Sequence, residues 1–519
     1  MHIADLLVIA AYLLTLIAIG IRVARQPATT DSYFVASRSV PGWAAGISLL
    51  ATTITSVTFI AYPGAAYAGD WSLLVPGIFF VVLIAAIGPI VVPFFRHVVS
   101  MSVYEYFGAR FGLAVRMYSS AAFAAGHFAK MGFVFYLLAL TVSSITGWPI
   151  AWMIVVLGVI TVFYTFIGGL KAVIWTDVVQ GFLLWTGVGV TLVLLLFSTH
   201  ETPAAMLRLI TTHHKTSLGS QHFNLAQPTF WTLAIYGIFF YLQKYTADQT
   251  VVQRYLAARS DREALRGMAM GASLCQPVWT AFMLIGSLLW AFYTLTGTVL
   301  PPAIQRTDQI FPHYMVTEFP AGVGGIFLAA LLGAAMSMLA SDLNCLGLVL
   351  VEDFYARLFP QSNDRQRLRF GKVAILLCGA LAVITAILFS GLNGIALALY
   401  YTATAVVAGG LAGIFLLAFL SRRAGSTAAI AGIAANLLFT IYASLTLNHG
   451  KLVDLHGFNY PWHEYTIGAI GNLLLLAVGL LTSMFFPASA TTSTQHTLWD
   501  WPDLRKQSRV PVFSIGETR

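Results

Sequence analysis

The stretch that decides the fold runs from Ala329 to Val351 and reads AALLGAAMSMLASDLNCLGLVLV. It is apolar and long enough to cross a bilayer, because about 20 residues at 1.5 Å each span the hydrocarbon. Ser337, Ser341 and Asp342 nevertheless lie in its middle. An ionised aspartate there costs roughly 2.5 to 3.5 kcal/mol unless it has a partner, a proton or a water-filled cavity. The stretch therefore predicts a membrane helix that contacts something polar.

Two neighbouring faces of this helix carry the polar side chains. Ser337 and Ser341 are four residues apart and share one face, while Met338 and Asp342 share the next face. Oxygen ligands on a buried helix suit a hard cation such as sodium, since they replace its hydration shell. Asp342 has a second interpretation, in which it reaches cytoplasmic water or pairs with a basic loop.

The composition places the chain among multi-pass membrane proteins. Of 519 residues, 58% are hydrophobic and only 9% are charged, and the mean hydropathy is +0.80. The three cysteines, Cys275, Cys345 and Cys378, lie in apolar runs without metal-ligand spacing and are predicted to be buried apolar residues. No cofactor is expected. A net charge of +8 could indicate nucleic-acid binding, but the basic residues are sorted by membrane side, which excludes that class.

Apolar runs and charged or Gly/Pro breaks predict thirteen transmembrane helices, with the N-terminus outside and the C-terminus inside. Of 28 Lys and Arg, 22 fall in predicted inner loops and the tail, and 4 fall in outer loops. This positive-inside bias predicts a multi-pass protein of the plasma (inner) membrane, in contact with the lipid bilayer. The predicted helices cover residues 5–21, 42–67, 72–95, 116–144, 149–168, 173–198, 230–252, 265–297, 322–350, 371–391, 394–420, 425–446 and 463–486.

Two of these helices carry polar interruptions. The second contains five hydroxyl residues in seven positions, from Thr52 to Thr58, shortly before Pro63. Such hydroxyls can occupy backbone groups freed by a broken helix, although they can also cap their own helix carbonyls. The seventh helix is interrupted between Tyr241 and Leu256. Broken helices five positions apart predict two inverted five-helix repeats around a midplane site.

The predicted repeats give an all-α domain organisation in which 42–198 and 230–420 are the two repeats. The remaining segments are a leading helix and inner loop at 1–41, an outer loop at 199–229, two trailing helices at 421–486 and a cytoplasmic tail at 487–519.

Five ordered blocks then resemble the sodium/solute symporter family. They are SYFVASRSVPGW (32–43), PFFRHVVSMSVYEYFGARFG (93–112), YTFIGGLKAVIWTDVVQ (164–180), TADQTVVQRYLAARSDREALRG (246–267) and GAAMSMLASDLN (333–344). The segments TTITSVTFIAYPGAAYAGDW (52–71) and AKMGFVFYLLALTVSSITG (129–147) are similar to bacterial sugar and sialic-acid symporters. The resemblance implies the leucine-transporter fold with one extra leading helix and two trailing helices.

The resemblance also implies sodium sites. The main site takes backbone oxygens at Ala51, Ile54 and Ala334 and hydroxyls at the positions of Ser337 and Met338. The thioether of Met338 departs from this pattern and is a poor ligand for a hard cation, which leaves four oxygens, weaker binding or a water in the gap. Asp342 is a possible substitute ligand.

A second sodium site in some family members implies Asp177 with Ser337, Ser341 and the position of Ala340, which here lacks a hydroxyl. Asp177 could instead hold Lys171 or a helix terminus.

Lys130 is the residue that bears on the solute. Related sialic-acid symporters carry an arginine in this place that meets the substrate carboxylate, and lysine keeps the charge but loses the bidentate fork. Three interpretations stay open for Lys130: solute contact, pairing with a distant acid, or deprotonation by burial. His127 is interpreted as a packed histidine. A cavity of hydroxyls and aromatic faces is predicted from Thr55, Thr58, Phe59, Lys130, Tyr241, Gln243, Tyr400, Tyr401 and Thr402.

These patterns predict a secondary active symporter rather than an enzyme. Sodium entry is expected to drive uptake of a small polar organic solute, such as a sugar, a sialic acid or another carboxylate, by alternating access around the midplane site. The alternatives are a proton-coupled carrier using Asp177 or Asp342, a sodium-independent carrier of the same fold, and a transporter-like sensor. The oligomeric state is not predicted.

Overall fold

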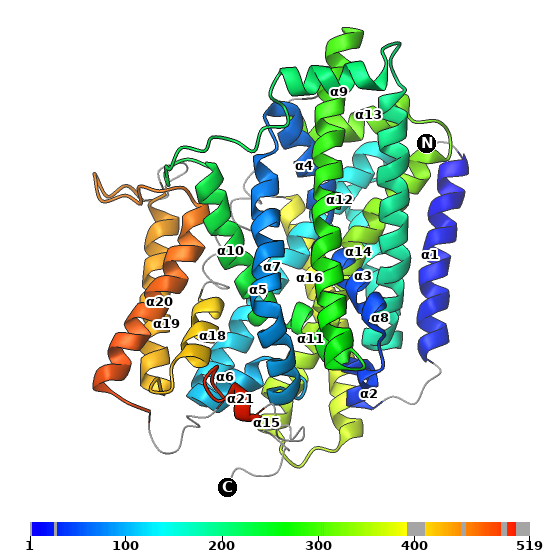
Figure 1. Cartoon of the computed structure of the whole chain (residues 1–519). Coiled ribbons are helices and arrows are strands. Elements are labelled where there is room, and N and C mark those ends of the chain that lie inside the picture. The colour runs from blue at the N-terminus through cyan, green and yellow to red at the C-terminus, as the bar shows by residue number, and fades with distance from the viewer. Residues whose placement is uncertain are drawn as a thin grey trace.

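A computed structural model describes residues 3–24, 29–302, 304, 306–391, 410–447, 453–488 and 496–504. Within these ranges the chain is helical, with two isolated backbone bridges, Val40 to Ala258 and Ala424 to Pro487, and no strand. The helices run roughly parallel as a bundle (Figure 1). The long helices are α1 (Ile3–Ala24), α5 (Val75–Val98), α7 (Leu113–Thr146), α8 (Ile150–Leu196), α12 (Asp261–Thr296), α14 (Val323–Val349), α16 (Asp364–Ser390), α19 (Ser426–Leu445) and α20 (Tyr465–Phe485).

Shorter helices complete the described chain. They are α2 (Thr30–Phe34), α3 (Gly42–Thr53), α4 (Ser56–Ala68), α6 (Tyr104–Phe111), α9 (Pro203–Thr212), α10 (Phe230–Thr246), α11 (Gln249–Ala257), α13 (Ile310–Glu318), α15 (Ala356–Leu358), α18 (Leu411–Leu420) and α21 (Trp501–Leu504).

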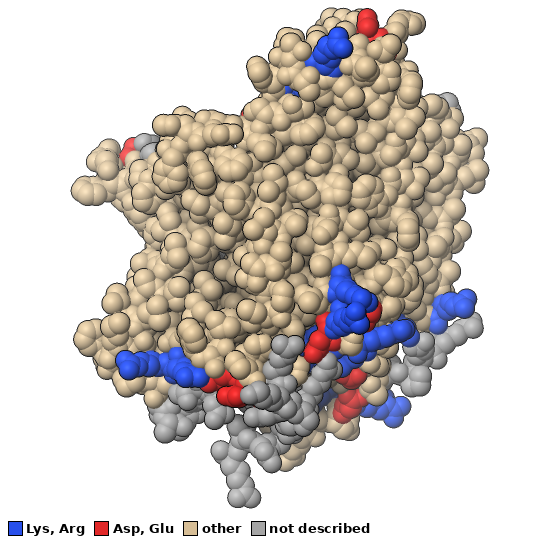
Figure 2. Space-filling view, viewed as in Figure 1, with Lys and Arg blue, Asp and Glu red and all other residues tan. Residues whose placement is uncertain are grey.

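Nine of the described helices are long and apolar enough to cross a membrane, and the bent pair α3 and α4 makes a tenth candidate. Figure 2 shows a broad belt without charged side chains between Lys and Arg residues gathered at the lower edge and a smaller charged group at the top. The chain is therefore an all-helical protein that crosses the membrane several times, as predicted. The predicted helix 394–420 falls mostly on residues outside the described ranges, and α18 is its described part.

α8 contains two of the predicted helices. Residues 149–168 and 173–198 were predicted as two helices with a short inner loop between them. α8 covers both in 47 residues, and its one non-helical position, Gly169 (φ 58°, ψ −161°), marks a kink between two helices where the loop was expected. A Cβ at Gly169 would lie 2.5 Å from the carbonyl oxygen of Tyr33, which explains why glycine stands at this break.

Both predicted interruptions are real breaks. α3 and α4 meet at Ile54 and Thr55 with a bend of 59°, and Thr55 caps α4 together with Thr58. α10 and α11 meet at Ala247 and Asp248, and Asp248 accepts a hydrogen bond from the Thr250 backbone N–H at 2.8 Å. Side chains that cap a new helix start explain why the chain stops and restarts at these positions.

α14 lies at the centre of this architecture. Every residue from Phe327 to Val349 is buried, and the helix packs against α1, α3, α7, α8 and α16. Because this helix is enclosed on all sides, its polar residues can meet any of several neighbouring helices. Its sequence alone does not say which partners they contact.

Candidate functional site

The first predicted cation position lies where the broken pair α3 and α4 passes α14, which packs against both helices. Ala51 and Ile54 are buried at the end of α3 and in the break, and Ala334 and Ser337 are buried on α14. Met338 is also buried, so its thioether occupies the core where a hydroxyl was expected. The structure holds these five residues on the two elements that the sequence pattern assigned to them.

The predicted second position, around Asp177, is a fully buried hydrogen-bonded cluster. Ser337 Oγ donates to Asp177 Oδ1 at 2.5 Å, and Ser48 Oγ donates to the other carboxylate oxygen. Ser341 Oγ donates to the Ser337 carbonyl oxygen at 2.8 Å. These contacts join α3, α8 and α14. Ser48 was not predicted, although it lies four residues before Thr52 on the same helix face.

Arg254 corrects the sequence analysis, because it was counted in an inner loop and is instead completely buried on α11. Its Nε donates to Ser48 Oγ at 2.8 Å, and its Nη2 lies 3.2 Å from Asp177 Oδ2. The guanidinium also donates to Thr52 Oγ1 at 2.6 Å, to Ser341 Oγ and to the Thr250 carbonyl oxygen. We call this set the Asp177 cluster: Ser48, Thr52, Asp177, Arg254, Ser337 and Ser341.

Arg254 is also the structural partner of Asp177. The expected structural partners were Lys171 or a helix terminus, and the observed partner is the guanidinium. Sequence offers one signal for it: the predicted seventh helix ended at residue 252, and extending it by one half-turn would have placed Arg254 inside the membrane. A membrane-buried arginine needs a carboxylate or several oxygen acceptors, and the Asp177 cluster supplies both.

A second polar group joins α7, α10, α11 and α14. Lys130 Nζ lies 2.8 Å from Asp342 Oδ2, and His127 Nδ1 lies 2.9 Å from Asp342 Oδ1. His127 Nε2 lies 3.5 Å from Asp248 Oδ2, which Lys244 Nζ approaches to 2.6 Å. We call this chain of paired acidic and basic side chains the charge ladder: Lys130, Asp342, His127, Asp248 and Lys244.

The charge ladder bears on two earlier interpretations. Lys130 pairs with a distant acid, Asp342, which was one of the three interpretations left open. The same contact engages Asp342 with α7, so its carboxylate is directed to Lys130 and His127 rather than to cytoplasmic water or a basic loop. His127 does pack, on the ring of Phe123 at a centroid distance of 4.0 Å, but it also bridges two carboxylates.

The predicted cavity residues have different surroundings. Phe59 is buried against Phe282, with ring centroids 4.6 Å apart, and Tyr241 stacks on Phe80 at 4.1 Å. These two rings therefore have packing roles in this conformation.

The hydroxyl and amide positions are less enclosed by aromatic rings. Thr55 and Thr58 lie at the break, where the Thr55 N–H donates to Thr58 Oγ1 at 3.4 Å, and Gln243 is partly buried on α10. Tyr400, Tyr401 and Thr402 lie outside the described residues.

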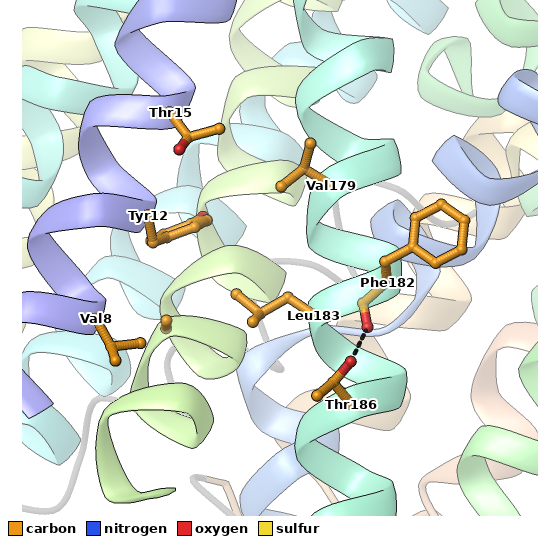
Figure 3. Close-up of a pocket in the computed structure, with 8 residues that line it drawn as sticks. Val8, Tyr12, Thr15, Val179, Phe182, Leu183 and Thr186 are labelled. Atoms are coloured by element: carbon orange, nitrogen blue, oxygen red, sulfur yellow. Dashed lines mark hydrogen bonds between the residues drawn. The ribbon is translucent and has the colours of Figure 1, made fainter. Parts of the chain in front are cut away.

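A pocket of about 340 Å³ lies elsewhere, between α1, α8 and α14 (Figure 3). Apolar side chains dominate its lining, and Thr186 Oγ1 turns to the Phe182 carbonyl oxygen at 3.0 Å. The Tyr12 hydroxyl at its wall accepts a hydrogen bond from Gln180 Nε2 at 3.0 Å. None of the predicted solute residues lines this pocket, so it is not the predicted solute cavity.

Comparison with known proteins gives consistent matches across the chain. The model of the sodium:solute symporter family matches residues 33–435. The sodium/sialic acid symporter NanT of Aliivibrio fischeri (strain ATCC 700601 / ES114) is 31% identical over 487 residues, which is 92% of this chain and 92% of that protein.

Solved structures agree with the fold. The substrate-bound outward-open state of a Na⁺-coupled sialic acid symporter superposes with a TM-score of 0.85 at 28% identity, over 94% of this chain and 99% of that chain. Mhp1, a nucleobase-cation-symport-1 family transporter, superposes with a TM-score of 0.57 at 15% identity, over 93% of this chain and 100% of that chain. The second likeness shows a shared transporter fold alone.

Proposed function

The chain belongs to the sodium:solute symporter family, and from this premise we propose that it is a secondary active symporter that couples sodium entry to uptake of a small polar organic solute. It is a transporter and not an enzyme. The observation that carries the proposal is the broken span α3 and α4, bent by 59°, against the buried polar face of α14. Backbone carbonyls freed at such a break, next to hydroxyls of a neighbouring helix, are the ligands that a sodium ion takes at membrane depth.

The proposed topology has thirteen crossings in the plasma (inner) membrane. α8 supplies two of the proposed crossings, and α18 is the described part of the proposed eleventh. In Figure 1, α1 begins at the top of the bundle and α21 lies at the bottom, as an odd number of crossings requires. The Lys and Arg residues gathered at the lower edge in Figure 2 support the lower side as cytoplasmic. The two inverted repeats are then residues 42–198 and 230–420.

The proposed sodium site uses the carbonyl oxygens of Ala51, Ile54 and Ala334 and the hydroxyl of Ser337. Met338 contributes no oxygen, so a water completes the shell or the ion binds with fewer ligands. Sodium binding favours the outward-open state and raises solute affinity, and this coupling is reciprocal.

The proposed solute is a small organic anion with polar groups, of which sialic acids are the first candidates. Two similar proteins, NanT and the solved symporter, handle sialic acid by name, which supports this class. Lys130 is the proposed anchor for a carboxylate. Because Asp342 already holds Lys130 at 2.8 Å, the solute carboxylate must replace or share this partner. Thr55, Thr58, Gln243 and the residues 400–402 supply the proposed polar contacts.

A proton-coupled carrier is the competing function, and the charge ladder is the observation that favours it. Both ring nitrogens of His127 face carboxylate oxygens, and both can donate only when the imidazole carries two protons. A proton that comes and goes between two carboxylates could take the place of a coupling ion.

Uptake into proteoliposomes separates these functions. The purified protein is reconstituted, and uptake of sialic acids, neutral sugars and monocarboxylates is measured with sodium or potassium outside at fixed pH, and then with an imposed proton gradient. A sodium symporter requires sodium, and Ser337→Ala raises the sodium concentration for half-maximal uptake at least tenfold. The matched control is Ser483→Ala, a buried serine on α20 whose hydroxyl donates to the Leu480 carbonyl oxygen of its own helix.

Uptake that ignores sodium but follows the proton gradient would replace the sodium proposal with the proton-coupled carrier. An equal effect of Ser337→Ala and Ser483→Ala would remove Ser337 from the sodium site.

A further inference from the structure

The last described segment of the chain, residues 496–504, lies on the inner ends of helices from both proposed repeats. We propose that this segment, which we call the tail clasp, holds α18 against α5 and α6 and must release before the inner side of the transporter opens. The inference goes beyond the proposed function and rests on its alternating access, but not on sodium as the coupling ion. The tail clasp lies beyond residue 435, where the family match ends.

The tail clasp completes the hydrogen bonding of the inner end of α18. The Leu498 N–H donates to the Phe419 carbonyl oxygen at 2.8 Å, and Trp499 Nε1 donates to the Leu420 carbonyl oxygen at 2.8 Å. Arg110 of α6 donates to two more carbonyl oxygens at this end. The last carbonyl groups of a helix have no partner within that helix. The inner end of α18 is therefore held by α6 and by the tail clasp.

A buried tryptophan attaches the tail clasp to the first proposed repeat. Trp501 keeps only 7% of its surface exposed, and its ring lies edge-on to Phe94 at a centroid distance of 5.8 Å and to His97 at 5.4 Å, both on α5. The Tyr106 hydroxyl of α6 donates to the His496 carbonyl oxygen at 2.9 Å. α21 accordingly lies beside α6 at the bottom of the bundle (Figure 1). A buried aromatic ring is a large apolar anchor, so α5 and α6 hold the tail clasp as α18 does.

Asp500 gives the tail clasp its shape and a further contact beside α18. Its Oδ2 accepts hydrogen bonds from the Thr497 N–H at 3.0 Å and from the Thr497 hydroxyl at 2.6 Å, which closes a turn within the segment. Its Oδ1 accepts from Arg422, two residues after α18, at 2.6 Å. The arginine of this ion pair is more than half exposed, and exposed pairs contribute little free energy. The attachment is therefore weak enough to be released and formed again.

The tail clasp bridges the two proposed repeats at the inner side. α5 and α6 belong to residues 42–198, and α18 belongs to residues 230–420. The rings of Phe94 and Phe419 lie 5.0 Å apart, and Trp501 covers the same Phe94 ring. Alternating access opens the inner side by moving one group of helices against another. Separating α18 from α5 breaks these contacts unless the tail clasp lets go of one side, so the clasp favours the inward-closed state.

A reversible lock tests whether the tail clasp must release. Leu420→Cys with Trp499→Cys places two thiols at an accessible part of the contact, since the native side chains are 38% and 58% exposed. The purified full-length variant is cross-linked in detergent with a short bis-methanethiosulfonate and reconstituted, and solute uptake is measured before and after reduction. Cross-linking is expected to lower uptake at least tenfold, and reduction is expected to restore it. The matched controls are the two single-cysteine variants and the wild type, whose three cysteines are buried.

Removing the buried anchor tests the opposite direction. Trp501→Ala is expected to keep solute uptake and to raise the labelling rate of Cys345 by N-ethylmaleimide at least threefold, measured by mass spectrometry. Cys345 is buried near the proposed inner end of α14, where its Sγ donates to Gln253 Oε1 of α11. Cys275 and Cys378 are internal controls, because general destabilisation raises the labelling of all three thiols. Opening of the inner side raises the labelling of Cys345 alone.

Asp500→Asn, at a partly exposed position, replaces Trp501→Ala if that variant does not fold. Unchanged uptake by the cross-linked protein would overturn the inference, as would a loss that reduction does not reverse or that a single-cysteine variant shares. Labelling that stays constant, or that rises equally at all three cysteines, would also overturn it.

Uptake driven by a proton gradient instead of sodium is a separate failure. It would remove the sodium-coupled function and leave the lock experiment unchanged. If the protein takes up no solute of the panel, the cysteine labelling decides, and a rise at Cys345 alone supports the tail clasp.

Discussion

The Asp177 cluster and the charge ladder are two groups of paired charged and polar side chains that differ in how far the protein encloses them. Both receive side chains from α14: Ser337 and Ser341 enter the cluster, and Asp342 enters the ladder. The side chains of Asp177 and Arg254 are fully buried, whereas Lys130 and Lys244 keep 17% and 18% of their side chains exposed. The cluster is therefore the sealed group, and the ladder, with its partly exposed lysine ends, is the open group.

The largest expected effect comes from breaking the sealed group. Asp177→Ala leaves the guanidinium of Arg254 buried without its carboxylate, and removing one partner of a buried ion pair costs about 3 to 5 kcal/mol. We expect a large fall in the unfolding temperature in detergent, which added sodium does not restore. A variant as stable as the wild type would mean that water already reaches the Asp177 cluster.

The corresponding change in the open group should cost less. Asp342→Ala removes the partner of Lys130 and of one His127 nitrogen, but water can reach the lysine end, so we expect a loss of about 1 to 3 kcal/mol. The same unfolding assay compares the two alanine variants directly. If Asp342→Ala is the more damaging, the contrast between sealed and open groups is wrong.

Solute recognition tests the opening at the lysine end. Lys130→Ala should weaken uptake of an anionic solute about tenfold to a hundredfold, because a hydrogen bond to a charged group contributes about 1.5 to 3 kcal/mol. The measurement is the solute concentration for half-maximal uptake. The matched control is Lys244→Ala at the far end of the ladder, which pairs with Asp248 and should change this value less than threefold. Equal losses in both variants would assign Lys130 to the structure of the ladder alone.

A smaller, opposite effect is expected at the proposed sodium site. Met338→Ser restores the hydroxyl that the resemblance implies, and one added oxygen ligand is expected to contribute about 1 kcal/mol. The sodium concentration for half-maximal uptake should fall about threefold to tenfold. The same substitution at Met336, another buried methionine on this helix, serves as the control and should not lower it. An unchanged sodium dependence would show that a water already serves as this ligand.

The smallest loss of stability is expected from an exposed ion pair, which serves as a reference for the two buried groups. Arg422 pairs with Asp500 at 2.6 Å near the end of the described chain, where the arginine side chain is more than half exposed. Arg422→Ala should change stability by less than about 1 kcal/mol, and by less still at high salt. A loss as large as that of Asp342→Ala would show that the tail carries a stabilising role that exposure alone does not predict.

Asp500 adds a pH dependence of known sign. Partial burial acts to raise its pKa, but hydrogen bonds from Thr497 and the pair with Arg422 outweigh it, and the pKa is lowered. A carboxyl whose pKa is lower in the folded state stabilises the fold above its unfolded pKa, and this contribution is lost as the pH falls through the folded value. The free energy of unfolding of the wild type should therefore fall slightly in acid. The corresponding fall in Arg422→Ala should be smaller.

The sequence predicted the breaks of this fold better than its pairings. Thr55 and Asp248 cap the starts of α4 and α11 through local hydrogen bonds. Such bonds depend on a few neighbouring residues and can be predicted from sequence. The predicted loop between residues 168 and 173 is replaced by a kink at Gly169, whose backbone conformation alone makes the break.

The pairing of Asp177 with Arg254 spans 77 positions, and the pairing of Lys130 with Asp342 spans 212. Such contacts depend on which helix faces meet. α14 has no apolar stripe to reveal its orientation, because it is buried all round. The sequence could therefore identify Ser337, Ser341 and Asp342 as important without saying that they serve two different groups.

The buried pair of Asp177 and Arg254 also bears on energy coupling, because both charges stay with the protein through a transport cycle. A charge that stays attached to the protein gains nothing from the membrane potential over a complete cycle, whereas a second travelling sodium would gain about 2.3 kcal/mol at 100 mV, or roughly a fiftyfold accumulation. With a monovalent anion and one sodium the cycle is electroneutral. Such a carrier follows the sodium concentration ratio alone, so it continues to work when the membrane is depolarised and gives up steep accumulation in return.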